Sequence, residues 1–419
     1  MELLILKLVA VLRPLASIKY LEAAFDVLGV GLIILLLAAL VMRGAVHKTL
    51  TLSAIDLLIV GFGIWCFAIY VIYFEAAQVR YVFKLLIPLF SYIVVKNIVH
   101  ERADYMNMLF WLIVASSIPV LVSAGLILAG SGIDRVNYWT GVVRYEGAYV
   151  ESHSFGHSMT LFLMMLVVYF GLRRDHGGAP PALKWAAAGV AAVALYCLYM
   201  SQVRSAIVGL IVFAAVYLYF LNKKWLLIGA VAASVIAVTT VSYWLYVLVP
   251  ELEVKQRGME VNVMELGSGR PTYWLHDLKL YLDLPIDQKI AGVGIGTGDP
   301  AADQAVEYKL YGHNDWLDIL TQTGLVGFSL FALLQILVFR SILGLSGRER
   351  YLFLALFLAV TIMMFVSNSY MWRIQVSQIY YMILAFIEIA PRDSRARAGW
   401  RQGVPRGAKG GRDKGNRKR

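Results

Sequence analysis

Two arginines of this sequence, Arg204 and Arg270, have types and positions suited to binding an anion. Arg204 lies in MSQVRSAIVG, at a junction between two apolar runs, where an arginine beside lipid is costly enough to suggest a functional role. Arg270 lies in GSGRPTYW, and Pro271 could begin a helix whose exposed amides would help this arginine to hold an anion. The simpler alternatives are a lipid-headgroup contact for Arg204 and a solvated loop cation for Arg270.

A histidine could supply base chemistry beside these arginines. His313 lies in YGHNDWLDILTQTGLVG, where Asn314 or Asp315 can cap the following helix and leave His313 at the positive end of its dipole. This position favours the neutral imidazole, which can accept a proton from a hydroxyl group. The simpler alternative is a histidine that only forms hydrogen bonds within a loop. Gly324 and Gly327, later in the same stretch, are interpreted as close-packing positions of a membrane helix.

Three further stretches could help to bind a substrate. In YEGAYVESHSFGHSM, Glu151 and His153 could line a sugar site. His153 and His157 have the i, i+4 spacing of two metal ligands, but no third ligand follows at a defined spacing, so we predict no metal site. In GVGIGTGDP, Gly294 and Gly296 follow no strand of a nucleotide-binding unit, so we expect a turn that approaches a sugar or headgroup.

Two more cations, Arg80 and Lys84, stand near the expected outer ends of two helices and could extend an anion site or form local ion pairs. The two cysteines, Cys66 and Cys197, lie in apolar runs and have no redox or metal spacing.

The elements that position these residues are predicted to be membrane helices. Of the 419 residues, 60% are hydrophobic and the mean hydropathy is +0.69, whereas soluble domains have about 45–50% apolar residues. The apolar runs are continuous, which excludes an outer-membrane barrel. The fold class is therefore all-α and polytopic, with about 11–12 transmembrane helices and one large outward loop containing short helices. The expected spans are 22–43, 52–74, 81–98, 107–129, 155–173, 183–202, 204–221, 225–249, 320–344, 350–367 and 373–391, with 3–20 either interfacial or a twelfth span.

The distribution of basic residues predicts the orientation. Short basic loops and the basic tail from Arg392 to Arg419 are expected on the cytoplasmic side, and the long segments 130–154 and 250–319 on the outer side. This gives a helical part at 1–249, an outward catalytic loop at 250–319, C-terminal helices at 320–391 and a disordered cytoplasmic tail at 392–419. The tail is expected to contact membrane lipids and not nucleic acid.

Together these motifs resemble the bacterial O-antigen ligase and O-antigen polymerase family over roughly residues 200–330. Arg204 and Arg270 resemble the two arginines of that family, and GVGIGTG resembles its glycine motif. The most recognisable stretch of the family is matched by His313, Asn314, Leu317, Gln322, Gly324 and Gly327. Gln322 stands where the family often has Glu, which puts any acid-dependent role there in doubt.

The resemblance implies a metal-independent, inverting glycosyltransferase of the bacterial inner membrane, with its active site facing the periplasm and with no cofactor. The donor would be a glycan on undecaprenyl pyrophosphate, and the acceptor a second lipid-linked glycan for a polymerase or lipid A-core for a ligase. Arg204 and Arg270 would stabilise the departing pyrophosphate, and His313 would activate the acceptor hydroxyl. The expected substrate-binding residues are Asn314, Arg80, Lys84, Tyr273, Gly294, Gly296, Glu151 and His153.

Two alternatives belong to other functional classes. A flippase for lipid-linked oligosaccharides would have paired charges within several spans and often internal repeats, and no clear repeat is present. A scaffold subunit of a glycan-synthesis complex would not need the set of Arg204, Arg270 and His313.

Overall fold

The computed structural model describes residues 1–19, 21–47, 52–74, 79–136, 143–174, 178–221, 270–296, 314–367 and 373–393. In these ranges the chain is almost entirely helical, with one small two-stranded sheet, and nine of the helices there are long and apolar enough to cross a membrane. Such helices satisfy their own backbone hydrogen bonds, as lipid requires. The prediction of an all-α polytopic membrane protein is confirmed.

Nine of the eleven expected spans correspond to these long helices. They are α2 (Glu22–His47), α3 (Ala54–Ile72), α4 (Val79–Ile98), α5 (Arg102–Leu128), α6 (Ser152–Arg174), α7 (Pro181–Ser201), α13 (Asp315–Leu343), α14 (Gly347–Val366) and α15 (Ile374–Leu384), whose course continues to Asp393. The expected span 204–221 is the shorter apolar helix α8 (Arg204–Phe220). The expected span 225–249 lies outside the described residues.

The first helix, α1 (Glu2–Leu15), is an inner element of the bundle. Its 14 residues extend about 21 Å, which is less than the thickness of a membrane core. Leu6, Val9 and Ala10 are fully buried, and the helix packs against α5 and α2. It is therefore neither a full span nor a helix lying on the outside of the bundle.

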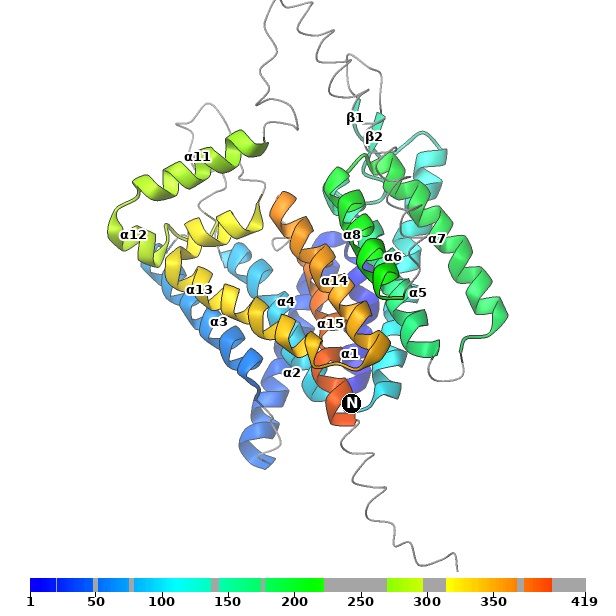
Figure 1. The fold of residues 1–419 in the computed structure, drawn as a ribbon, viewed down its shortest axis with the longest axis horizontal. Coiled ribbons are helices and arrows are strands. Elements are labelled where there is room, and N and C mark those ends of the chain that lie inside the picture. Colours follow the sequence, from blue (N-terminus) through cyan, green and yellow to red (C-terminus); the bar gives the residue numbers. More distant parts are fainter. Residues whose placement is uncertain are drawn as a thin grey trace, which may run out of the picture.

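The ends of the described helices gather at two ends of the bundle (Figure 1). One end carries the strands β1 (Ile133–Val136) and β2 (Val143–Tyr145), the short helices α11 (Arg270–Asp283) and α12 (Ile286–Ala291), and the first residues of α6, α8 and α13. The opposite end carries the last residues of α6 and α13 and the first residues of α7 and α14. The antiparallel strands were not predicted, because they are too short to give a clear alternating pattern. Below, the end with α11 is called the upper end.

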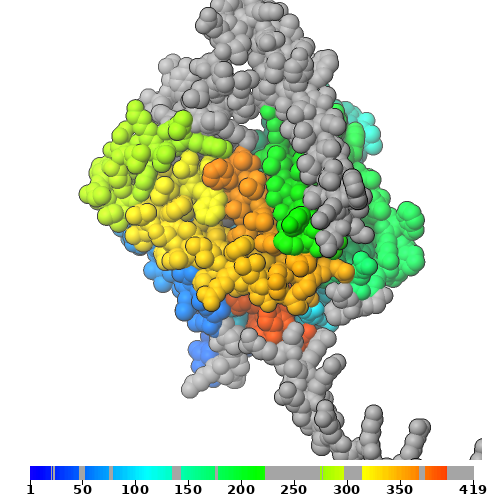
Figure 2. All heavy atoms as spheres, viewed as in Figure 1, coloured from blue at the N-terminus to red at the C-terminus, as the bar shows by residue number. Residues whose placement is uncertain are grey.

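Helix α14 divides the upper end into two sides. It packs against α8 and α6 on one side and against α13 on the other. Figure 2 shows the same arrangement on the molecular surface, with α11 and α13 to the left of α14 and α8 to its right. Both sides contain residues that the sequence singled out.

The lower end is held together by buried charges. Lys96 of α4 is 1% exposed, and its ammonium group contacts Asp56 of α3 and, at 2.7 Å, Glu388. Asp56 also forms a capping box with Ser53 at the start of α3. These contacts join α3, α4 and the C-terminal helical segment at the end that is remote from Arg204 and Asn314.

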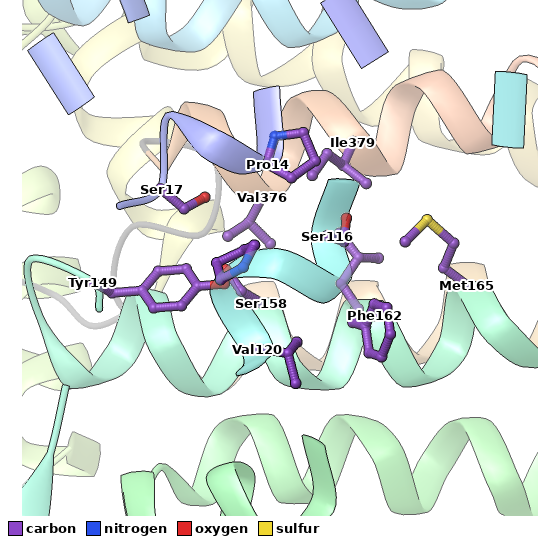
Figure 3. Close-up of a pocket in the computed structure, with 12 residues that line it drawn as sticks. Pro14, Ser17, Ser116, Val120, Tyr149, Ser158, Phe162, Met165, Val376 and Ile379 are labelled. Carbon is purple, nitrogen blue, oxygen red and sulfur yellow. The ribbon is translucent and has the colours of Figure 1, made fainter. Parts of the chain in front are cut away.

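A small cavity lies between α1, α5, α6 and α15 (Figure 3). Its lining includes the hydroxyl-bearing residues Ser17, Ser116, Tyr149 and Ser158. The volume of about 20 Å³ has room for about one water molecule. A sugar must therefore bind elsewhere.

Candidate functional site

Helix α13 is broken near its beginning, and the break exposes backbone acceptors. Gly324 has φ 63° and ψ −174°, which interrupts the helix, and the helix changes direction there in Figure 1. The carbonyl oxygens of Thr321 and Gln322 accept hydrogen bonds from the amides of Val293 (3.1 Å) and Gly294 (3.3 Å). The next carbonyl, of Thr323, accepts from the indole nitrogen of Trp65 at 2.9 Å. A helix break inside a membrane bundle is tolerated when its freed carbonyls find such partners.

Two glycines make this contact between backbones possible. A Cβ atom on Gly324 would collide with the carbonyl oxygen of Ile290, and one on Gly292 would collide with that of Gln322. Gly292 also has φ 92°, a conformation that favours glycine. The interpretation of Gly324 as a simple packing position was wrong, because its positive φ breaks the helix. Gly327 is a packing position, since a Cβ atom there would lie 2.9 Å from Trp65.

The side chain of Gln322 adds a third contact between α13 and the segment that includes Val293 and Gly294. Its Oε1 atom accepts a hydrogen bond from the amide of Gly296 at 2.8 Å, and the residue is 7% exposed. Residues 292–296, called the glycine segment below, are thus held on α13 by two backbone carbonyls and one side chain. No structural role was predicted for Gln322, and the structure shows that it makes this contact.

Tyr81 places two of the predicted cations beside the glycine segment. A Cβ atom on Gly296 would collide with its ring. The Arg80 guanidinium lies 4.6 Å from the ring centroid and donates to the Tyr81 hydroxyl at 2.7 Å, and the Lys84 ammonium lies 5.8 Å from the centroid. The structure therefore brings Arg80, Lys84 and Gly296 together, with Tyr81 as the residue that the sequence did not identify.

Asn314 caps α13, and it is one of the two residues, Asn314 and Asp315, that were predicted as possible caps. Its Oδ1 atom accepts hydrogen bonds from the amides of Trp316 (3.0 Å) and Leu317 (3.3 Å), and the residue is 2% exposed. His313 precedes this cap in the chain but lies outside the described residues. Arg270 is the first residue of α11, which confirms the helix expected there; its side chain and that of Tyr273 are not among those described.

An apolar groove lies beside the capped end of α13. Its volume is about 740 Å³, and it runs between α11, α13 and the upper end of α14. Trp274 of α11 meets Phe365 of α14 edge to face, with ring centroids 5.4 Å apart. We call this the upper groove, and its lining residues are Trp274, Leu275, Leu278, Asn314, Trp316, Leu317, Leu320, Phe328, Thr361 and Phe365.

On the other side of α14, a buried histidine joins three helical elements. His157 of α6 is fully buried, and its Nε2 atom lies 3.1 Å from the Ser205 hydroxyl and 3.3 Å from the Ser367 hydroxyl. Ser205 follows Arg204, so the contact fixes the start of α8, where Arg204 is the first helical residue. The close approach of the two helices needs Gly156, because a Cβ atom there would collide with Val203.

An ion pair lies next to this histidine in the fold. Arg373 donates to Glu151 at 2.7 Å and to the Ser154 hydroxyl at 3.0 Å. Burial favours the protonated Glu151, but the Arg373 charge and the hydrogen bonds from Arg373 and Ser154 outweigh it and hold the pKa of Glu151 below its usual value. Together with His157, Ser205 and Ser367, these residues form what we call the His157 cluster.

The predicted site residues thus fall into two groups separated by α14. Arg80, Lys84, Gly294, Gly296 and Asn314 lie on or near α13, whereas Arg204, Glu151 and His153 lie near the starts of α6 and α8. His153 faces His157, with ring centroids 6.3 Å apart. Substrate binding by these residues stays a prediction.

The sequence did not identify Tyr81, Ser205, Ser367 or Arg373, and it gave no structural role for Gln322. Only Arg373 carried a usable signal, as a cation at the start of an apolar run.

Comparison with known proteins identifies one family. No curated protein matches the chain. The family model of the O-antigen ligase matches residues 189–332, which include α8, α11, α12, the glycine segment and the broken part of α13. The resemblance inferred from the motifs is confirmed by this match over residues 189–332.

Proposed function

We propose that the protein transfers a glycan from undecaprenyl pyrophosphate to an acceptor hydroxyl at the outer leaflet of the bacterial inner membrane, as a polysaccharide polymerase or ligase. The family supports a membrane enzyme of the glycan ligase or polymerase class in general. The observation that carries the finer proposal is the position of the upper groove, which reaches the capped start of α13 one residue after His313.

The upper groove has the properties needed to hold a polyprenyl chain. Its lining is formed by leucines and aromatic rings from three helices, and Asn314 and Thr361 are the polar residues among those described in it. Burial of a hydrocarbon chain in such a groove is favourable in proportion to the area removed from water. A donor whose tail lies there would present its pyrophosphate near the first turn of α13.

The two predicted arginines begin helices at this same end. Arg270 starts α11 and Arg204 starts α8, so each arginine would add its charge to the positive end of a helix dipole. Backbone amides at helix starts and arginine side chains both bind phosphate oxygens. In this proposal they stabilise the negative charge that grows on the departing pyrophosphate, and Arg80 and Lys84 add positive charge beside the glycine segment.

His313 would act on the acceptor. Asn314 uses its side chain to cap the helix, and His313, the residue before this cap in the chain, has a ring that can accept a proton. The histidine would take the proton of the acceptor hydroxyl while that oxygen attacks the anomeric carbon from the face opposite the pyrophosphate. The bond to pyrophosphate breaks as the new glycosidic bond forms, which inverts the anomeric centre.

The first test is transfer by the purified protein from a lipid-pyrophosphate glycan. His313→Ala and Arg270→Ala should each lower the transfer rate by about 10²–10⁴-fold, the range for losing a proton-transfer or charge-stabilising group. His100→Ala and Arg174→Ala are matched controls, since His100 follows the end of α4 and Arg174 ends α6, both at the lower end, and both variants should transfer at the wild-type rate.

The acceptor is tested in the same assay by offering lipid A-core and a second lipid-linked glycan separately. Product on the first identifies a ligase, and product on the second a polymerase. Near wild-type transfer by either site variant would overturn the assigned roles. Movement of the lipid-linked glycan across the membrane without transfer would support the flippase alternative.

A further inference from the structure

We propose that Gln322 is a positioning residue, which fixes the start of the chain segment that carries His313 onto the broken helix α13. This inference rests on the proposed function for its catalytic consequence, and on the contacts of described residues for its geometry.

The break in α13 makes a docking site out of backbone atoms. In an unbroken helix the carbonyl oxygens of residues 321–323 would accept from amides one turn further along. With Gly324 at φ 63°, the first two of these carbonyls accept from Val293 and Gly294. Any sequence with small enough residues could form these two bonds, because they involve no side chains.

The third contact depends on one side chain. The Oε1 atom of Gln322 accepts from the Gly296 amide at 2.8 Å, and both residues are buried. A buried amide that loses its acceptor carries an uncompensated desolvation cost, which favours opening of the contact. Gln322 is therefore the residue that keeps the last described part of the glycine segment, Ile295 and Gly296, from leaving α13.

The position of Gln322 along the chain gives the contact its consequence. Residues 297–313 connect Gly296 to Asn314, and both of these end points are bound to α13. Gln322 holds one end, and the Asn314 cap fixes the other about 12 Å away along the helix. Anchoring both ends of a segment reduces the number of conformations open to it. His313, next to the second anchor, would thereby be restricted relative to a substrate in the upper groove.

The chemistry of the contact requires an oxygen acceptor and does not require a charge. A glutamate at this position has the same reach, and its carboxyl group accepts the Gly296 amide bond whether or not it is ionised. A methionine of similar size has no comparable acceptor.

The test compares Gln322→Met, Gln322→Glu and a matched control, Gln335→Met. Gln335 is a buried glutamine of the same helix, but its hydrogen bond goes to the Tyr381 hydroxyl and not to the glycine segment. Hydrogen–deuterium exchange of the peptide covering residues 290–296 is measured without substrate, in lipid nanodiscs. The kcat and the donor KM are measured in the transfer assay.

Gln322→Met should speed exchange of the Gly296 amide about tenfold and lower kcat about tenfold, while the donor KM stays within about twofold. Gln322→Glu should restore slow exchange and most of kcat, and Gln335→Met should leave both unchanged. The proposal is overturned if Gln322→Met keeps slow exchange, if Gln322→Glu behaves like Gln322→Met, or if Gln335→Met gives the same losses. Absence of transfer by the wild-type protein would instead count against the proposed function, and exchange would still decide the docking by Gln322.

Discussion

The two sides of α14 are built from different kinds of contact. On the α13 side, the glycine segment is held mainly by backbone atoms, and glycines at 292 and 324 allow the close approach. On the α6 and α8 side, the His157 cluster is held by side chains that carry charges, hydroxyls and a buried imidazole. The difference predicts different sensitivities: the first side should be damaged by adding a single carbon atom, and the second by removing a polar group.

The largest effect should come from Gly324→Ala. A Cβ atom there collides with the Ile290 carbonyl oxygen, and alanine is strained at φ 63°. Strain and overpacking together should destabilise the protein by about 3 kcal/mol or more and abolish transfer. Thermal unfolding in detergent and the fraction of monodisperse protein measure this effect.

Gly189→Ala is the control for this substitution, because a Cβ atom at Gly189 meets no atom within 4 Å. That variant should be as stable as the wild type or slightly more stable. If Gly324→Ala were as stable as the wild type, the close backbone contact between the glycine segment and α13 would be contradicted. The two sides of α14 would then no longer differ in their sensitivity to an added carbon atom.

This contrast also explains what the sequence could and could not predict. The membrane helices were predictable because a span needs a long apolar run, and the start of α11 followed from Pro271. The break at Gly324 was not predictable, because glycines in membrane helices commonly serve packing, as Gly327 does. Its cause lies in residues 290–294, about thirty positions earlier in the chain, and a local pattern carries no information on such a contact.

The candidate site was predictable only where its contacts are local in sequence. Asn314 was identified as a cap because capping is local, and the structure confirms it. The roles of Gln322 and Tyr81 depend on partners far away in sequence, and so do those of Ser205 and Ser367 around His157. Burial of α1 was missed because its length resembles that of an interfacial helix.

A smaller loss of stability is expected from removing the His157 imidazole on the α6 and α8 side of α14. His157→Leu replaces the imidazole with an apolar side chain of similar size and leaves the Ser205 and Ser367 hydroxyls without this partner. The expected loss is about 1–3 kcal/mol of unfolding free energy, measured by chemical denaturation in detergent. His157→Gln, which keeps a hydrogen-bonding group near the Nε2 position, should recover part of the loss. A His157→Leu variant as stable as the wild type would show that the polar contacts on this side contribute little.

The smallest effect is a pH dependence of stability. It should arise from the His157 cluster and not from the contact between the glycine segment and α13. The pKa of Glu151 is lower in the folded protein than in the unfolded chain, because burial raises it but the Arg373 charge and the hydrogen bonds from Arg373 and Ser154 together outweigh burial. The Glu151–Arg373 pair therefore stabilises the fold fully above the unfolded pKa of about 4.3, and this contribution is lost as the pH falls through the lower folded value.

The predicted loss of stability at low pH is tested by comparing the unfolding temperatures of the wild type and Glu151→Gln from pH 7 to pH 3. The wild type should be more stable by a constant amount from pH 7 to about pH 5, and the difference should shrink below about pH 4. Glu101→Gln is the control, because Glu101 is exposed and forms no capping bond at the start of α5, so its effect should not change with pH in this way. If the difference in unfolding temperature between the two proteins grew on acidification, Arg373 would not lower the pKa of Glu151. The charged contact would then no longer distinguish the α6 and α8 side of α14 from the α13 side.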